Sequence, residues 1–178
     1  MSAAQEVESA RDIFAELYEE FLPKVFRYVR YRVNNPQVTE DLTSTVFEKA
    51  LTSFEKFSRD KASFSTWIFA IARNVVIDHY RVQGRRRTVS LEEAEIEVAS
   101  NELPPDEALV RIEEREKLHA CVSRLSDEEQ EIISLKFGSE LNNRQIAKML
   151  GLSESNVGTK LCRAVRKLRD SFQETENG

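Results

Sequence analysis

Residues 142–169 read NNRQIAKMLGLSESNVGTKLCRAVRKLR, and this stretch decides the fold of the C-terminal half. Its pattern is two short helices joined by a tight turn. Ala147 is a small residue where the helices would touch, Gly151 supplies the turn, and Val157 is an apolar anchor in the second helix. Because these residues have the spacing that the motif requires, the stretch predicts a helix-turn-helix.

Start signals precede both helices of this motif. Asn142 and Gln145 form a variant of the capping box, and Ser153 is placed to cap the second helix. Gly158 is unexpected inside that helix, since a mid-helix glycine costs about 1 kcal/mol relative to alanine. Either a ligand approaches the backbone closely there or the helix tolerates the glycine.

The second helix is basic after Val157, with cations at Lys160, Arg163, Arg166, Lys167 and Arg169. Such a helix can enter the major groove of DNA, so DNA is the expected ligand. Four side chains near the start of this helix are expected to contact base edges: Ser155, Asn156, Thr159 and Lys160. Arg163 and Lys167 are expected to contact either a base or a phosphate. The alternative is an ordinary helical hairpin with a solvated basic side.

The chain as a whole carries a net charge of −5 over 178 residues, in contrast to this basic helix. Residues 73–87 and the last helix are basic, whereas residues 91–116 are rich in glutamate and aspartate. Local patches decide phosphate binding, while net charge sets the non-specific attraction to DNA. An acidic chain with two basic patches is expected to bind free DNA weakly and to need a protein partner.

The N-terminal half is expected to be helical. The only tryptophan, all four tyrosines and eight of the ten phenylalanines precede residue 81, which predicts two cores of different character. Apolar residues recur at helical spacing from 13 to 29, with Pro23 predicting a kink or a local break. Thr39 is placed to cap a second helix, and Ser63 to cap a third, which Gly84 and the following arginines would end.

The two halves are joined by residues 88–105, which are acidic, end in two prolines and lack helical periodicity. They are interpreted as a flexible linker. A helix is expected after it, and Ser126 with Glu129 forms a capping box that opens the next one. No stretch predicts a strand. The predicted fold class is all-α, with two small helical domains at residues 1–87 and 106–178.

A second candidate nucleic-acid site lies in residues 58–87, where aromatic residues alternate with arginines. Rings that stack on bases and arginines that hold phosphates suit single-stranded or melted DNA. Helical spacing offers a structural explanation for Trp67 and Phe69, which are expected in the core. For the polar loop before Ser63 and the polar residues of the third helix, both a DNA contact and a purely structural role stay open.

The chain lacks the patterns of a metal site or a catalytic site. Cys121 and Cys162 are far apart without a CxxC partner, and His79 and His119 are isolated, so no disulfide framework or metal site is expected. Neither a phosphate-cradling glycine loop nor a nucleophile elbow occurs, so no enzyme activity, cofactor or small-molecule substrate is expected. No apolar run approaches the ~20 residues that span a bilayer, and the polar start is unlike a signal peptide, so a cytoplasmic location is expected.

Both halves together resemble the extracytoplasmic-function (ECF) sigma factors of bacterial RNA polymerase. Similarity to region 2 of that family rests on LYEEFLPKVFRYVRYRV, EDLTSTVFEKAL and SFSTWIFAIARNVVIDHYR. Similarity to region 4 rests on LSDEEQEIISLKF followed by the helix-turn-helix. The resemblance covers roughly residues 11–170 and leaves only the linker unmatched.

The resemblance implies a transcription initiation subunit without catalytic activity. In the family, the segment matching residues 40–50 docks on the clamp helices of the polymerase core, which implies contacts by Asp41, Leu42 and Glu48; the sequence pattern alone indicates only a solvated helix face there. The segments matching the loop and the third helix bind the −10 element and capture a base flipped from the melted strand. This implies DNA contacts by Asp60, Lys61, Ser63, Asn74, Asp78 and Arg81. The helix-turn-helix binds the −35 duplex and docks on the polymerase flap.

Family members are often held inactive by an anti-sigma factor, often membrane-anchored, and the resemblance implies such a partner here. One alternative function stays open. A stand-alone helix-turn-helix regulator would be a dimer that binds palindromic DNA without polymerase, with the N-terminal half serving dimerisation or sensing.

Overall fold

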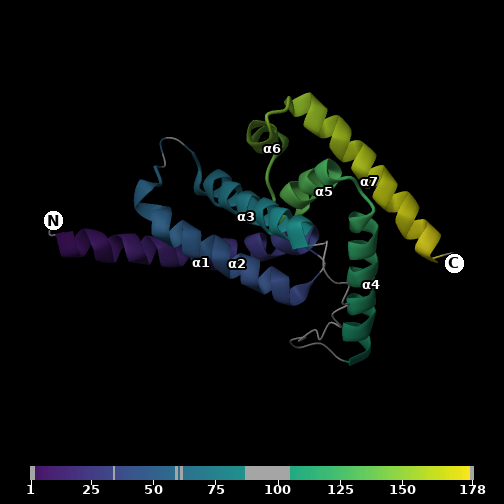
Figure 1. Ribbon diagram of the computed structural model, residues 1–178, viewed down its shortest axis with the longest axis horizontal. Helices are drawn as coiled ribbons and strands as arrows, with labels where there is room; N and C mark the ends of the chain where they lie inside the picture. The colour runs from purple at the N-terminus through teal and green to yellow at the C-terminus, as the bar shows by residue number, and fades with distance from the viewer. Residues whose placement is uncertain (1–2, 34, 59, 61, 87–104, 177–178) are drawn as a thin grey trace.

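The structure, a computed structural model, describes residues 3–33, 35–58, 60, 62–86 and 105–176 (Figure 1). Every regular element in these ranges is helical, which confirms the all-α class. In chain order the elements are α1 Ala3–Arg32, α2 Pro36–Ser53, the 3-10 helix η1 Phe54–Lys56, α3 Phe64–Arg86, α4 Pro105–Ser123, α5 Asp127–Ile133, the π-helix η2 Ser134–Gly138, α6 Asn143–Leu150 and α7 Glu154–Glu176. No helix in the described ranges is both long and apolar enough to cross a membrane.

The N-terminal half is a bundle in which α1, α2 and α3 pack against one another. The residue that caps the start of α2 differs from the predicted one. Asn35 caps α2, because its side chain accepts a hydrogen bond from the Val38 amide at 3.0 Å, and Pro36 occupies the first helical position, where a missing N–H costs nothing. The predicted cap at Thr39 is therefore wrong. Thr39 lies one turn inside α2 and donates its hydroxyl to the Asn35 carbonyl at 2.8 Å.

Two helix breakers lie inside helices. α1 runs through Pro23, so the chain has no break there. The exposed Pro23 stands between the buried side chains of Phe21 and Val25, and their packing holds both sides of the helix in place. Gly84 lies inside α3, which ends at Arg86, within the stretch of Gly84 and arginines that was predicted to end it. At Pro23 tertiary packing outweighs local propensity.

The C-terminal half starts its helices where the sequence predicts. Ser126 and Glu129 form the expected capping box at α5, and Asn142 and Gln145 form the expected variant at α6. Gly151 ends α6 in the left-handed conformation with φ of 68°. These local signals are confirmed because each is satisfied within a single turn of chain.

The two halves share one apolar core, so the prediction of two separate cores is wrong. The main cluster of buried side chains combines Val25, Val29 and Phe69 with Ile132, Leu135, Leu141 and Ile146. A smaller cluster of described residues, formed by Leu125, Ile133 and Ala164, belongs to the C-terminal half alone. Figure 1 shows the cause: α5 stands in the middle of the molecule, with α3 on one side and α7 on the other. Residues 87–104, which hold nearly all of the predicted linker, lie outside the described ranges.

Candidate nucleic-acid and polymerase interfaces

The helix-turn-helix is formed by α6 and α7, which pack against each other. Ala147 and Val157 are both buried where the helices touch. The amide of Leu152 donates to the Ala147 carbonyl at 2.9 Å and closes the turn. Ser153 caps α7, since its hydroxyl accepts from the Asn156 amide at 3.1 Å. The motif predicted from spacing is therefore confirmed.

The structure brings the six predicted duplex contacts onto α7. Five of them are exposed and one is half-buried: Ser155, Asn156, Thr159, Arg163 and Lys167 are exposed, and Lys160 is half-buried. Most are three or four residues apart, so they share one side of the helix. This arrangement suits a helix that enters a groove of duplex DNA.

Two of these cations are already paired with carboxylates of α5, which the sequence did not predict. Lys160 Nζ lies 2.7 Å from Glu128 Oε2, and Lys167 Nζ lies 2.6 Å from Glu129 Oε1. The hydrogen bond from Lys167 lowers the pKa of the Glu129 carboxyl below its usual value. DNA phosphates must compete with both carboxylates. Arg163 has no carboxylate partner within the described part of the chain.

The third helix places Asn74, Asp78 and Arg81 on one exposed side of α3. They line a groove of about 560 Å³ between α2 and α3. Lys49 and Ser53 of α2 line the same groove, and the sequence pattern did not mark either as a candidate. The groove therefore combines cations, a carboxylate and an amide, which can hold phosphates and read base edges.

The loop before α3 is only partly described. Asp60 is exposed in a turn, and Lys61 lies outside the described residues. Ser63 is exposed but has a structural task, because its hydroxyl accepts from the Thr66 amide at 3.2 Å and caps α3. Any contact from Ser63 to DNA has to share that hydroxyl.

The aromatic rings of this segment are mostly core, as helical spacing predicts. Phe64 and Phe69 are buried, and Trp67 is half-buried against Phe57 with ring centroids 4.9 Å apart. The rings of Phe64 and Trp67 lie 5.4 Å apart between centroids, and the ring of Phe69 packs against Phe21 and Tyr28. These rings are therefore unavailable as a row of stacking platforms for bases.

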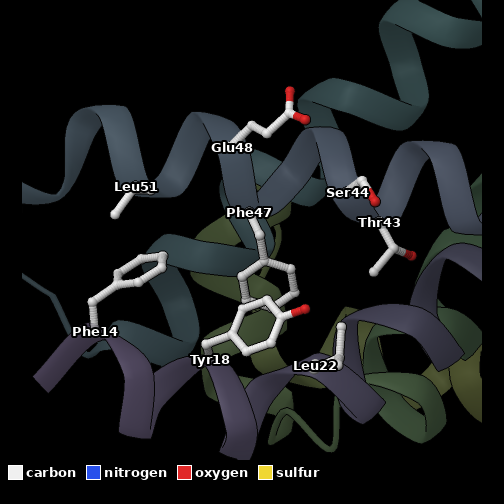
Figure 2. Close-up of a pocket in the computed structure, with 8 residues that line it drawn as sticks. All are labelled: Phe14, Tyr18, Leu22, Thr43, Ser44, Phe47, Glu48 and Leu51. Carbon is white, nitrogen blue, oxygen red and sulfur yellow. The ribbon is translucent and has the colours of Figure 1, made fainter. Parts of the chain in front are cut away.

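The three predicted polymerase contacts lie on α2. Asp41 and Glu48 are exposed, and Leu42 is half-buried. Glu48 stands at the rim of an apolar groove of about 300 Å³ between α1 and α2 (Figure 2). The groove is lined mainly by Phe14, Tyr18, Leu22, Phe47 and Leu51. Leu51 belongs to the apolar stripe of α2, yet its side chain is 56% exposed. An exposed apolar side chain beside a groove is typical of a surface that binds another protein.

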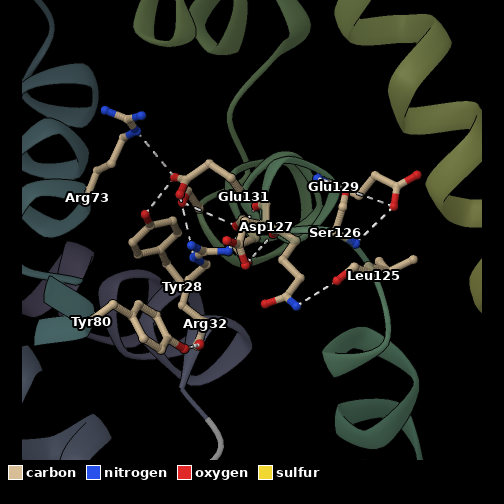
Figure 3. Close-up of polar contacts among 12 residues, drawn as sticks. Tyr28, Arg32, Arg73, Tyr80, Leu125, Ser126, Asp127, Glu129 and Glu131 are labelled. Carbon is tan, nitrogen blue, oxygen red and sulfur yellow. Dashed lines mark hydrogen bonds and ion pairs between the residues drawn. The ribbon is translucent and has the colours of Figure 1, made fainter. Parts of the chain in front are cut away.

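A buried carboxylate joins the two halves of the chain. Glu131 of α5 accepts a hydrogen bond from Tyr28 Oη at 2.7 Å, and its oxygens lie 3.5 Å from Arg32 Nε and 3.7 Å from Arg73 Nε (Figure 3). Burial, followed by the charge of Glu131, raises the pKa of the Tyr28 hydroxyl well above its usual value. Arg32 also donates to the Asp127 carbonyl at 3.2 Å.

Among the residues that the structure describes, the two arginine Nε groups at this carboxylate have no hydrogen-bond acceptor. Their distances to Glu131 are too long for hydrogen bonds, although they are short enough for ion pairs. A buried donor without an acceptor costs about 1–3 kcal/mol. The carboxylate therefore joins the two halves with incomplete hydrogen bonding.

Comparison with protein families matches both halves of the chain. The family described as Sigma-70 region 2 matches residues 17–86, and the family described as Sigma-70, region 4, matches residues 115–168. The linker predicted at residues 88–105 falls between these two matches.

Among curated proteins, the ECF RNA polymerase sigma factor SigX of Bacillus subtilis is 30% identical, over 91% of this chain and 84% of its own length. The ECF RNA polymerase sigma factor BldN of Streptomyces coelicolor is 32% identical over 88% of this chain, which spans 59% of the length of BldN. Among solved structures, the sigma factor RpoE in complex with the anti-sigma factor NepR from Bartonella quintana has a TM-score of 0.72 at 20% identity, covering 90% of this chain and 96% of RpoE. The last comparison shows a shared fold.

Proposed function

The chain belongs to the ECF RNA polymerase sigma factors, and on that premise we propose which of its surfaces read DNA and which bind polymerase. As a sigma factor it directs RNA polymerase in transcription initiation. In the proposed division, residues 1–87 act as region 2, residues 106–178 act as region 4, and residues 88–105 link them. A sigma factor is a transcription initiation factor, and we assign it no catalytic step of its own.

The −35 duplex is read by α7. The single observation that carries this assignment is the exposed side of α7, which follows the turn at Gly151 and presents Ser155, Asn156, Thr159, Lys160, Arg163 and Lys167 together. The residues nearest the start of α7 meet base edges, and Arg163 and Lys167 reach a base or a phosphate.

The −10 element is bound as a melted strand at the groove between α2 and α3. Asn74 reads base edges there, while Arg81 and Lys49 offer cations to phosphates. Asp78 pairs with Arg81 at 3.3 Å and orients its guanidinium. Asp60, Lys61 and Ser63 approach the same strand from the loop. Because the rings of Phe64 and Phe69 are buried, base edges and phosphates contribute more to this binding than stacking does.

The polymerase core is bound by α2 through Asp41, Leu42 and Glu48. The observation that supports this is the exposed acidic side of α2 beside an apolar groove that no segment of the described chain fills (Figure 2). Charge complementarity then requires basic residues on the clamp helices. Region 4 docks on the polymerase flap.

An anti-sigma factor is the proposed inhibitory partner, anchored in the membrane in many family members. The supporting observation is that one solved structure of similar fold is the sigma factor RpoE in complex with the anti-sigma factor NepR. Another is CnrH in complex with the cytosolic domain of CnrY, with a TM-score of 0.68 at 21% identity, covering 97% of this chain and 95% of CnrH. Because RNA polymerase acts in the cytoplasm, we place the protein there.

These assignments are tested by titrating fluorescently labelled protein with sigma-free core polymerase. Glu48→Lys is expected to weaken core binding at least tenfold, because it reverses the charge at the groove. Glu16→Lys, which reverses an exposed charge on α1, is the matched control. Equal binding by the two variants would show that α2 is not the polymerase contact, and no binding by the unaltered protein would refute the function itself.

A further inference from the structure

Gly158 of α7 faces the start of α6. A Cβ added at Gly158 would lie 3.8 Å from the amide nitrogen Nδ2 of Asn143, the first residue of α6. The φ of Gly158 is not positive, so the backbone conformation does not require glycine here. A glycine inside a helix also weakens the helix relative to alanine. The missing side chain therefore costs stability, and it leaves a space open beside Asn143.

The side-chain amide of Asn143 is held so that it can only donate further hydrogen bonds. Its Oδ1 accepts from Lys136 Nζ of η2 at 3.2 Å. Among the described residues, Nδ2 donates to no acceptor. Both Lys136 and Asn143 are half-buried, so each keeps contact with solvent. The pair therefore offers two amide hydrogens and a positive charge to an anion.

The side of α7 that includes Gly158 has no cation up to residue 165. Gly158, Cys162 and Val165 recur there at helical spacing, whereas Lys160 and Lys167 lie on the opposite flank. A helix in the major groove of DNA has a sugar–phosphate backbone on each side. Over these turns, the backbone on the Gly158 side meets no cation of α7. Its phosphates therefore need partners from another element.

We propose that Gly158 leaves a gap through which one phosphate of the −35 duplex reaches the Asn143 amide, while Lys136 orients this amide and adds its charge. The inference rests on the proposed reading of the −35 duplex by α7. The Asn143 Nδ2 donates to a phosphate oxygen, and the DNA backbone approaches α7 closely because residue 158 has no side chain. Asn143 is thus a contact residue, and Gly158 and Lys136 are positioning residues.

The test is a scan of single phosphates across the −35 duplex. A promoter is first selected from a randomised library with the holoenzyme, and each phosphate of its −35 motif is then replaced in turn by a neutral methylphosphonate. For the unaltered protein, one replacement should weaken holoenzyme binding roughly tenfold, the loss typical of a hydrogen bond to a charged group. In Asn143→Ala the same replacement should cost less than about twofold. An identical profile for the two proteins would show that Asn143 contacts no phosphate.

Two variants at residue 158 test the gap itself. Gly158→Ala places one carbon beside Asn143 and Gly158→Leu places four, and both residues form helices better than glycine. Holoenzyme binding should weaken from glycine to alanine to leucine, while thermal unfolding shows no loss of stability. Sensitivity to the identified phosphate should disappear in Gly158→Leu. Unchanged binding by both variants would show that the helix only tolerates its glycine.

The contribution of Lys136 is measured on a random-sequence duplex without polymerase. Lys136→Met keeps the length of the side chain and removes its charge, and Lys117→Met, at an exposed position of α4, is the matched control. Lys136→Met should reduce the slope of log affinity against log salt concentration by up to about 0.9, and Lys117→Met should leave it unchanged. Equal slopes for the two variants would overturn the role of Lys136.

The same duplex separates this inference from the proposed function. Failure to select any promoter with core polymerase would refute the function of the protein as a sigma factor. The affinity of Gly158→Leu for the random-sequence duplex would still decide the inference, because a phosphate contact is independent of base sequence. Weaker binding than that of the unaltered protein would support the gap, and equal binding would contradict it.

Discussion

The ion pairs between α5 and α7 predict that carboxylates of region 4 lower the affinity of the protein for duplex DNA in the absence of polymerase. The perturbation is the double variant Glu128→Gln, Glu129→Gln. It removes the two negative charges that lie 2.7 Å and 2.6 Å from Lys160 and Lys167. Glutamine at 129 can still accept from the Ser126 amide, so the capping box at α5 is kept.

The expected gain follows from the exposure of these pairs. Lysine–carboxylate pairs at a protein surface are worth about 0.2–1 kcal/mol each, and binding to phosphates has to break or share them. Releasing both should therefore strengthen binding to duplex DNA roughly 2- to 30-fold. Two freed lysines should also steepen the slope of log affinity against log salt concentration by up to about 1.8, at ~0.9 for each phosphate contact.

The assay is fluorescence anisotropy of a random-sequence duplex over a series of salt concentrations, with the stability of each variant checked by thermal unfolding. The control is Glu16→Gln, Glu19→Gln, which makes the same change in net charge, from −5 to −3, on exposed positions of α1. An equal gain by the control would attribute the effect to net charge. An unchanged affinity and salt slope for the Glu128, Glu129 variant would refute the reasoning.

Three further predictions concern single residues. Arg163→Ala should cost about 1–3 kcal/mol of holoenzyme binding at one −35 base position, measured with singly substituted duplexes, whereas an equal loss on every sequence would mark a phosphate contact instead. Gly158→Ala should raise the free energy of unfolding by up to about 1 kcal/mol in chemical denaturation, because the nearest atom to its added Cβ is 3.8 Å away in Asn143; a destabilised variant would contradict this. Burial and then the charge of Arg30 lower the pKa of His119 to about 4, so protonation of the unfolded chain should remove stability as pH falls from 6.5 to about 4. After a discount for solvent screening, the loss in the free energy of unfolding should be about 1–2 kcal/mol. The variant His119→Gln should show a weaker dependence of this free energy on pH. An unchanged pH dependence in that variant would rule out His119 as the cause.

The elements that sequence predicts best are those whose signals are satisfied locally. The caps at Ser126 and Asn142 and the turn at Gly151 each depend on partners within a few residues, and all are confirmed. The cap at Thr39 fails for a local reason of the same kind. Asn35 followed by Pro36 is a stronger start signal four residues earlier, and it leaves Thr39 inside the helix.

The features that sequence does not predict are those made between distant segments. Tyr28 and Glu131 are 103 residues apart, and nothing in either neighbourhood marks them as partners. Gly138 carries no turn signal, and only the backbone of α1 beside it explains why it lacks a side chain. The aromatic bias of the N-terminal half indicates a core there, but it contains no information about the aliphatic face of α5 and η2 that completes it.

The measurement that tests the central claim most directly is promoter selection from a randomised DNA library, transcribed by sigma-free core polymerase with and without this protein. Transcripts should depend on the protein, and the selected templates should carry two short motifs, one read by α7 and one read at the groove between α2 and α3, at a fixed separation. A single palindromic motif, bound by a dimer of the protein without polymerase, would contradict the account and establish a stand-alone regulator.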